Sequence, residues 1–455
     1  MLDILTQLNY NIHNVVSDHA LRRTDMTDKG LIRIAILGFG TVGAGVYQLV
    51  QRQKEELEAK TGRSAEVAKV LVRDASKPRE GIDASVLTDS FKEILGDPSI
   101  DIVVEVMGGI EPARTYITQA LQAGKNVVTA NKDLMATHGG ELLALAKEMG
   151  KDLLFEAAVA GGIPIIRPMK QCLAGNHMTQ VMGIVNGTTN YILTKMAQEG
   201  MEFDEALAKA TELGYAEADP TADIEAYDAG RKLAILASLA FHSRVTFSDV
   251  YTEGITKITA ADIRYAREMG SVIKLLAIAR ETAEGIEAGV QPMLISQSHP
   301  MAAVNDVFNA VFIHGDAVDD VMFYGRGAGR FPTASACMGD VVDIMRNIQY
   351  GCTGRIGCGC YRQLPIKPMA DTEQKYFFRL RCADRPGVLA AISSVMGRMG
   401  VSIKQMVQKP TENDTVAELV LITDSVKEAS FMEALEEIKG LDVVYEVASM
   451  IRVHE

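Results

Sequence analysis

The sequence is poor in cysteine, with six thiols in 455 residues. Since a disulfide framework needs a much denser set, we expect reduced thiols and no stabilising disulfides. Three of the cysteines, Cys352, Cys358 and Cys360, stand close together. Their C-x5-C-x-C spacing is not that of known zinc sites, which argues against a structural metal there.

The chain also lacks a long apolar segment. A membrane-spanning helix needs about 20 apolar residues, and no uncharged run approaches that length. The first 30 residues carry His13, Asp18 and Arg22 where a signal peptide requires an apolar stretch. We therefore expect a cytoplasmic protein that has no membrane partner.

Positive charge is scarce and scattered. The chain has 46 Lys and Arg residues against 59 Asp and Glu residues, which gives a formal net charge of −13. A protein that binds nucleic acid through phosphates needs a basic patch, and none is visible. We expect a small-molecule substrate and no nucleic-acid partner.

What is present is the composition of a globular protein, with 47% hydrophobic and 23% charged residues. A chain of this length exceeds what one core organises, so it predicts two or three domains. Residues 1–30 show no clear periodicity and form an expected N-terminal extension, a pattern that favours disorder. The expected domains are 31–160, 161–360 and 375–455, with residues 361–374 as a linker that holds two prolines.

The first domain alternates between strand and helix patterns. A buried strand begins at Leu31, and further strand patterns at 66–74, 101–107, 126–130 and 152–157 alternate with helix patterns. This alternation predicts an α/β, Rossmann-type doubly wound parallel sheet that binds a dinucleotide.

The other two domains differ from the first. In 161–360, apolar segments are separated by expected helices at 198–213, 225–241 and 260–281, which favours an α+β domain for catalysis and dimerisation. The last part of this domain can pack back on the first domain. Residues 375–455 follow a βαββαβ pattern. A segment of this length is large enough to fold independently.

A glycine-rich turn follows the first strand and opens a helix. It reads G-x-G-x-x-G, and it predicts that the helix N-terminus binds a pyrophosphate. The residues of this turn are Gly38, Phe39, Gly40, Thr41, Val42 and Gly43. The second strand ends at Arg73 and Asp74. Because an arginine can accept a 2′-phosphate, Arg73 favours NADP over NAD, although a purely solvent-exposed role for Arg73 stays open.

Several longer motifs make the sequence recognisable. VVEVMGG, NVVTANKDLMATHG, FEAAVAGGIPII, GIVNGTTNYIL and LGYAEADPTADIEAYDAGRKLAILA resemble those of the homoserine dehydrogenase family, and GRGAGRFPTASA agrees. The resemblance runs from about residue 31 to residue 360. It implies reversible, NAD(P)-dependent reduction of L-aspartate 4-semialdehyde to L-homoserine, a step in threonine and methionine biosynthesis.

One charged pair in these motifs can also be interpreted from its spacing alone. A helix that begins near Thr221 would place Asp228 and Lys232 on one face, four residues apart. An isolated pair of this kind is usually a surface salt bridge of small energy. Here an apolar continuation, LAILASLA, indicates that the helix is buried and that the pair faces a cleft.

The resemblance assigns roles to individual residues. Lys232 is at the position of the family's proton-transferring lysine, and Lys132 would bind the cofactor and take part in proton transfer. Glu217, Asp228 and Asp223 resemble substrate-binding acids, with N-capping as an adequate alternative for Asp223. Gly214 and Gly327 match positions that touch the cofactor. A sodium ion (Na+) would be bound through Glu156, Val159, Gly161 and Ile163.

The C-terminal segment with DRPGVLA resembles an ACT domain, a module that binds amino acids. It implies feedback regulation, with threonine as the leading effector, and a homo-oligomer. Asp384, Arg385, Pro386 and Gly387 form the loop that would approach the effector, although a Pro-Gly pair also serves simply as a turn. Two alternative functions are compatible with parts of the sequence. An aspartate-semialdehyde dehydrogenase needs a cysteine nucleophile with a histidine partner, for which Cys172 and His177 are weak candidates. A non-catalytic, cofactor-dependent amino-acid sensor would not need both lysines and both acids.

Overall fold

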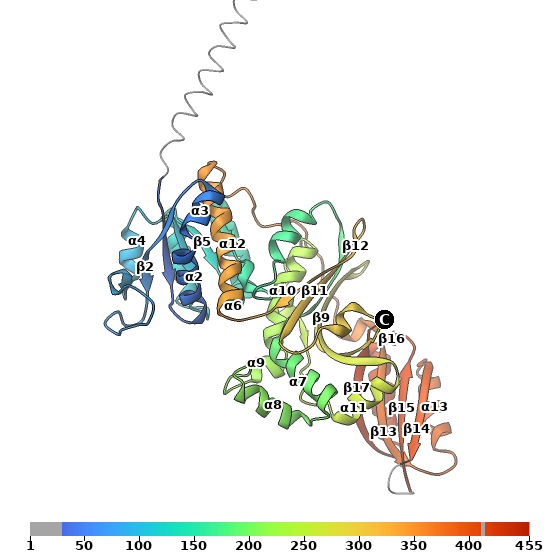
Figure 1. The fold of residues 1–455 in the computed structure, drawn as a ribbon. Helices are drawn as coiled ribbons and strands as arrows, with labels where there is room; N and C mark the ends of the chain where they lie inside the picture. The colour runs from blue at the N-terminus through green and yellow to red at the C-terminus, as the bar shows by residue number, and fades with distance from the viewer. Residues whose placement is uncertain (1–29, 411–414, 455) are drawn as a thin grey trace, which may run out of the picture.

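The computed structural model describes residues 30–410 and 415–454. The expected extension at 1–30 lies outside the described residues except for Gly30. Three bodies follow one another in Figure 1, from the blue parallel sheet through the green and yellow middle to the red C-terminal domain. No described helix is both long and apolar enough to cross a membrane.

The first domain is a six-stranded parallel sheet in the order β3-β2-β1-β4-β5-β6, as the Rossmann prediction requires. Its strands are β1 (Ile32–Leu37), β2 (Ala65–Leu71), β3 (Leu87–Thr88), β4 (Ile102–Glu105), β5 (Asn126–Thr129) and β6 (Leu153–Leu154). Its helices are α2 (Thr41–Arg52), α3 (Lys54–Thr61), α4 (Phe91–Gly96), α5 (Ala113–Gln122) and α6 (Lys132–Glu148). One core joins α2 and α3 to the sheet and another joins α4, α5 and α6 to it, so the sheet is covered on both faces.

The second domain is a mixed sheet with helices packed on it. Its strands are β7 (Met178–Ile184), β8 (Tyr251–Thr252), β9 (Ser271–Thr282), β10 (Gly285–Ser296), β11 (Phe308–Gly315) and β12 (Asp319–Arg326). Its helices are α7 (Gly187–Glu199), α8 (Phe203–Glu212), α9 (Thr221–Ile224), α10 (Tyr227–Ala240), α11 (Ala260–Glu268) and α12 (Arg330–Gln349). Short single turns are η3 (Glu156–Ala158), η4 (Pro168–Cys172), η5 (Phe247–Asp249) and η6 (Pro300–Ala303).

The helix expected over residues 260–281 was wrong in its second half. The helix α11 ends at Glu268, Gly270 adopts a left-handed conformation with φ of +71°, and β9 begins at Ser271. A glycine in this conformation commonly terminates a helix. The apolar residues beyond it fill a central strand that pairs with β7 and β10, so the periodicity of a buried strand was mistaken for that of a helix.

The helix α12 leaves the second domain and returns to the first. Figure 1 shows it in orange beside the blue helices, and its apolar face belongs to the core that contains α2 and the parallel strands. Ala334 is in van der Waals range of Gly45, where a side chain on residue 45 would collide with α12. The closing helix therefore links the sheet to the second domain across the site described below.

The third domain has the predicted βαββαβ order and a four-stranded antiparallel sheet, β17-β13-β15-β14. Its elements are β13 (Glu373–Ala383), α13 (Val388–Arg398), β14 (Ile403–Pro410), β15 (Val416–Thr423), β16 (Val426–Lys427), α14 (Glu428–Lys439) and β17 (Val444–Val453). Because β17 pairs with β10, this sheet continues the sheet of the second domain. The connecting segment, with the turn η7 (Met369–Asp371), makes single bridges to Ser243 and Ile286.

Candidate active site

The glycine turn between β1 and α2 forms as predicted. Gly38 has a φ of +103°, and a side chain on Gly43 would lie 2.1 Å from the carbonyl oxygen of Gly38. A side chain on Gly40 would instead meet no atom within 4 Å, so this position borders open space. Thr41 is the first residue of α2, and Phe39 packs edge-on against Tyr47. The turn can thus bring its backbone close to a pyrophosphate, which is the fit that a dinucleotide requires.

A second loop beside the glycine turn is held by Glu105, which the sequence analysis did not single out. The carboxylate of Glu105, at the end of β4, accepts hydrogen bonds from the backbone N–H groups of Met107 and Gly108 and from the hydroxyl of Thr129, at 2.7, 3.3 and 2.6 Å. Burial raises the pKa of Glu105 despite these donors. The amide of Asn131 donates to the carbonyl of Gly109 at 2.6 Å and fixes the far end of the loop.

A cavity of about 330 Å³ opens between these two loops and the second domain. Val42, Lys132, Gly161, Lys232 and Gly327 are among the residues that line it. It lies outside the carboxyl ends of parallel strands, where sheets of this type bind their ligands. The structure therefore brings together five of the sequence-predicted residues around the expected cofactor site.

An adjoining cavity of about 510 Å³ shares Lys132 with the first. Its lining includes the three predicted substrate-binding acids, Glu217, Asp223 and Asp228. The cavity is acidic, as a site for an ammonium group should be. Arg231 also borders it, where it pairs with Asp133 at 2.9 Å and lies over the ring of Phe247.

Asp228 links the two lysines at the boundary of the cavities. Its Oδ1 is 2.5 Å from Lys132 Nζ, and its Oδ2 is 2.6 Å from Lys232 Nζ. Lys232 also donates to the carbonyl oxygen of Val185 at 2.7 Å. The side chain of Asp228 is 6% exposed, whereas that of Lys132 is 37% exposed, so the carboxylate is enclosed and the lysine reaches the open space.

The electrostatics of this cluster follow from its charges. Burial alone would raise the pKa of Asp228, but the ammonium groups of Lys232 and Lys132 outweigh it and hold that pKa well below its ordinary value. Burial opposes the charge on Lys132, yet Asp228 raises its pKa. For Asp223, burial prevails and raises the pKa. The two lysines thus favour the ionised form of the Asp228 carboxylate.

Asn186 is a site residue that sequence reasoning missed. Its Nδ2 donates to Asp223 at 2.6 Å and to Asp228 at 2.9 Å, while its Oδ1 caps α7 by accepting from Thr189 N. The residue is inside the quoted motif GIVNGTTNYIL, but the motif alone gave no reason to choose it. Only the approach of α7 to α10 shows that one amide positions both acids.

The helix that carries Asp228 and Lys232 begins later than expected. The chain forms the short helix α9 from Thr221, then turns at Ala226 with φ of +66°, and α10 starts at Tyr227. This break places Asp228 in the first turn of α10, where the helix dipole also favours a carboxylate. The predicted spacing of four residues between Asp228 and Lys232 is preserved.

The expected sodium loop has a distinctive backbone. Ala160 and Gly161 have φ values of 54° and 52°, and the loop closes with Gly162 N donating to the carbonyl of Arg326 at 3.0 Å. The Glu156 carboxylate already accepts from the backbone N–H groups of residues 165, 166 and 167. The carboxylate of Glu156 is therefore engaged by the backbone, and the sodium site expected at Glu156, Val159, Gly161 and Ile163 stays a prediction.

Two predicted cofactor residues lie away from the cavities. Arg73 is exposed just beyond β2, and the adjacent Asp74 turns its carboxylate to Ser76, with 2.6 Å to the hydroxyl. Gly214 follows α8 with φ of +73° and is not among the residues that line either cavity. Neither position is tested by the structure, and both stay predictions.

The cysteines are free, as expected. No group of three or more Cys, His, Asp and Glu side chains in residues 30–410 and 415–454 could hold a metal ion. Cys172 is exposed and lines neither cavity, so the structure does not place a thiol nucleophile beside the two lysines.

Comparisons with known proteins decide between the remaining interpretations. Family models match residues 38–156 as "Homoserine dehydrogenase, NAD binding domain", 164–342 as "Homoserine dehydrogenase" and 376–442 as "ACT domain". A homoserine dehydrogenase of Bacillus subtilis is 44% identical over 424 residues, which cover 93% of this chain and 98% of that protein. The chain belongs to the homoserine dehydrogenase family.

Solved structures agree with this family assignment. The crystal structure of a homoserine dehydrogenase from Thiobacillus denitrificans matches with a TM-score of 0.89 and 42% identity, over 94% of this chain and 99% of that one. A hyperthermophilic archaeal homoserine dehydrogenase in complex with NADPH matches with a TM-score of 0.59 and 26% identity, over 69% of this chain and 98% of that one. The predicted fold class, the oxidoreductase activity and a nicotinamide cofactor are thereby confirmed.

Proposed function

We propose that Lys232 is the proton-transfer group of the homoserine dehydrogenase reaction, and that Lys132 assists it at the cofactor side. The single observation that carries this proposal is the Lys132–Asp228–Lys232 cluster at the boundary of the two cavities. A bound nicotinamide cofactor supplies or accepts the hydride. The protein then has to bind the amino acid, exclude water and move one proton.

The proton step follows from the contacts of Lys232. In the direction of reduction, its ammonium donates a proton to the aldehyde oxygen of L-aspartate 4-semialdehyde; in the direction of oxidation, the neutral amine takes the proton from the hydroxyl of L-homoserine. Val185 O and Asp228 Oδ2 fix the position of Nζ, so the amine reaches the reacting oxygen with little loss of freedom.

The acids of the second cavity bind the substrate's ammonium group. Glu217 and Asp223 both line it, and Asn186 holds Asp223 beside Asp228. Each carboxylate oxygen of Asp228 faces a lysine ammonium group, so its main part is to position the lysines, and Glu217 and Asp223 remain to contact the amino acid. Binding the ammonium group here turns the side-chain carbonyl toward Lys232.

Replacement of Lys232 by methionine tests the proton-transfer role. Because general acid–base catalysis contributes about 10²- to 10⁴-fold, Lys232→Met should lower kcat by about that factor while cofactor binding persists. Lys209→Met, at an exposed lysine paired with Glu199, is the matched control and should retain the wild-type rate. A Lys232→Met enzyme with near wild-type kcat would assign the proton transfer to another group.

The preference for NADP is also proposed, and it depends on Arg73. Asp74 is bound to Ser76, so its carboxylate does not compete for a ribose, and Arg73 stays free for a 2′-phosphate. Arg73→Ala should raise the KM for NADPH about tenfold, the loss of about 1.4 kcal/mol of binding, and leave the KM for NADH unchanged. An equal change with both cofactors would contradict a contact to the 2′-phosphate.

The finer properties of this family member are proposals as well. We infer that the loop 384–387 of the ACT domain binds an amino-acid effector, with threonine as the first candidate, and that the enzyme is a homo-oligomer in the cytoplasm. Support comes from the βαββαβ fold and the free thiols. The left-handed turn at residues 160–161 supports a sodium ion, which should stabilise the enzyme to heat more than potassium does.

A further inference from the structure

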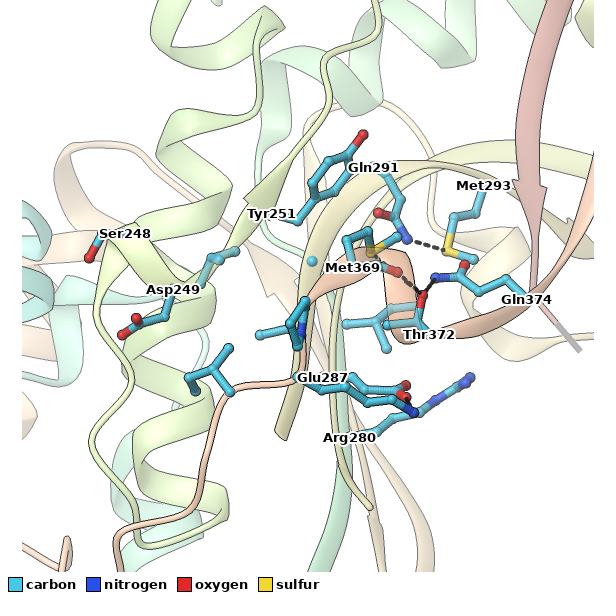
Figure 2. Close-up of a pocket in the computed structure, with 17 residues that line it drawn as sticks. Ser248, Asp249, Tyr251, Arg280, Glu287, Gln291, Met293, Met369, Thr372 and Gln374 are labelled. Atoms are coloured by element: carbon cyan, nitrogen blue, oxygen red, sulfur yellow. Dashed lines mark hydrogen bonds and ion pairs between the residues drawn. The ribbon is translucent and has the colours of Figure 1, made fainter. Parts of the chain in front are cut away.

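A third cavity, of about 360 Å³, lies where the second domain meets the connecting segment to the ACT domain. We call it the junction cavity. Figure 2 shows Ser248 and Asp249 on one side of it, with Gln291, Thr372 and Gln374 on the other. None of the proposed catalytic, cofactor, sodium or effector residues lines it, so it is separate from the sites described above.

Two glutamine side chains in the junction cavity are not satisfied by the protein. Gln291 on β10 is only 4% exposed, and its Nε2 has a sulfur, Met293 Sδ at 3.8 Å, as its partner. The Oε1 atoms of Gln291 and Gln374 are buried and have no hydrogen-bond partner among the described residues. Both residues line the cavity, and since a buried unpaired polar group costs about 1–3 kcal/mol, two of them beside one cavity indicate a polar ligand that these side chains turn to meet.

Charges of both signs surround these amides. Arg280 on β9 lines the cavity and contacts the neutral acceptors Gln180 Oε1 and His454 Nδ1 at 3.2 and 3.1 Å. It has no carboxylate within ion-pair distance in the described part of the chain. Glu287, paired with Lys367 at 3.0 Å, supplies the opposite charge on the same wall. A half-buried guanidinium without a carboxylate partner is suited to a carboxylate ligand.

We propose that the junction cavity binds a small zwitterionic α-amino acid. On binding, the amides of Gln291 and Gln374 rotate so that their Oε1 atoms accept from its ammonium group, and its carboxylate pairs with Arg280. The volume admits a small amino acid, as the small-molecule pockets of proteins begin at about 300 Å³. This inference adds a second location to the proposed amino-acid regulation, and it rests on that proposal only for its effect on activity.

The junction cavity is connected to the active site by the turn η5. Ser248 and Asp249 line the junction cavity. The preceding residue, Phe247, lines the cavity of about 510 Å³ that contains the predicted substrate-binding acids, which we call the substrate cavity. Phe247 packs against Tyr227 on the first turn of α10 with ring centroids 6.2 Å apart. A ligand that shifts η5 therefore moves a wall of the substrate cavity and alters the KM for homoserine.

Isothermal titration calorimetry of the full-length enzyme with each proteinogenic L-amino acid tests the proposal. We expect at least one of them to bind, while its des-amino carboxylic acid and its decarboxylated amine do not. Gln291→Leu keeps the side-chain volume and should weaken binding about tenfold, because one charge-assisted hydrogen bond is lost. Gln297→Leu, at an exposed glutamine beyond β10, is the matched control and should bind normally.

A second variant covers the case in which Gln291→Leu does not fold. A methyl group on Gly289 would lie 3.1 Å from Gln291 Oε1, so Gly289→Ala narrows the cavity without removing a polar group, and it should also abolish binding. Homoserine turnover by both variants reports on folding. Absence of binding by every amino acid would overturn the proposal, because water would then satisfy the amides.

The variant Arg385→Ala distinguishes binding at the junction cavity from binding at loop 384–387 of the ACT domain. Binding lost in this variant but retained in Gln291→Leu would overturn the junction site and leave regulation through loop 384–387 intact. Binding lost only in the cavity variants would support the junction site and contradict the loop.

Discussion

Two charged side chains that line cavities of this molecule, Asp228 and Arg280, have opposite surroundings. Asp228, in the active site, is enclosed by the ammonium groups of Lys132 and Lys232. Arg280, in the junction cavity, contacts only the neutral acceptors of Gln180 and His454 at hydrogen-bond distance. The first charge is fully compensated within the protein, and the second is solvated by groups that carry no charge.

The presence or absence of an oppositely charged partner indicates the role of each side chain. A buried ion removed from its partners leaves those partners uncompensated, so the Asp228 cluster is needed by the fold itself as well as by the reaction. An arginine without a carboxylate leaves no unpaired ion behind when it is replaced. We therefore expect Arg280 to contribute to ligand binding more than to the stability of the fold.

Asp228→Asn should have the largest effect, because it leaves two ammonium groups together without a counter-charge. The free energy of unfolding should fall by about 3–5 kcal/mol at neutral pH, and kcat should fall with it. Urea unfolding measures the first quantity. Asp133→Asn, which breaks a half-exposed pair with Arg231, is the control and should cost less than about 1 kcal/mol.

The pH dependence of the same variant sharpens this prediction. The pKa of Asp228 is depressed in the folded protein, so its contribution to stability is full above the ordinary aspartate pKa and is lost as the pH falls below it. The unfolding midpoints of wild type and Asp228→Asn should therefore approach one another only in acid. A constant difference between them down to pH 2 would show that the charge is not responsible.

Arg280→Met should have a smaller effect on stability. A methionine fills the space of the aliphatic part, and the lost hydrogen bonds to Gln180 and His454 are neutral, so we expect a change within about 1 kcal/mol. Urea unfolding checks this expectation. A loss as large as that of Asp228→Asn would remove the contrast between the two sites, whereas a small loss together with weakened amino-acid binding would support a ligand.

Replacement of His454 by glutamine should have the smallest effect on stability, and that effect is visible only in the pH dependence of unfolding. Burial, then the charges of Arg280 and His299, lowers the pKa of His454 to about 4. Its contribution to stability is full above the ordinary histidine pKa of 6.5 and is lost as the pH falls from there towards 4. Thermal unfolding should show a shallower decline over this window in His454→Gln than in wild type. Equal slopes would mean that other groups dominate.

The sequence predicted the fold well where a motif determines the local backbone geometry. The G-x-G-x-x-G turn, the spacing of four residues between Asp228 and Lys232, and the alternation of strands and helices each describe local structure, so the parallel sheet could be predicted before any contact was known. The prediction of one helix over residues 260–281 was wrong because a buried strand and a buried helix share an apolar composition. Gly270 was the signal that could have separated the two.

The acids and lysines of the site were predicted from the resemblance to the family, but their arrangement was not. Lys132 begins α6 and Lys232 is on α10, a hundred residues apart, and their common partner could not be read from either helix. Glu105 and Asn186 were missed because their roles depend on the neighbours of β4 and α7. The junction cavity, too, is formed by β9, β10 and the start of β13, which come together only in the folded chain.

The sequence by itself therefore determined the class of the fold, because backbone turns and helical spacings are local properties, and its resemblance to a known family implied most of the chemistry. The tertiary structure decided which charges are compensated, which amides are left unpaired and how the ACT sheet joins the sheet of the second domain through β10 and β17. Those properties depend on burial and on contacts between residues distant in the chain, where desolvation makes each missing partner costly.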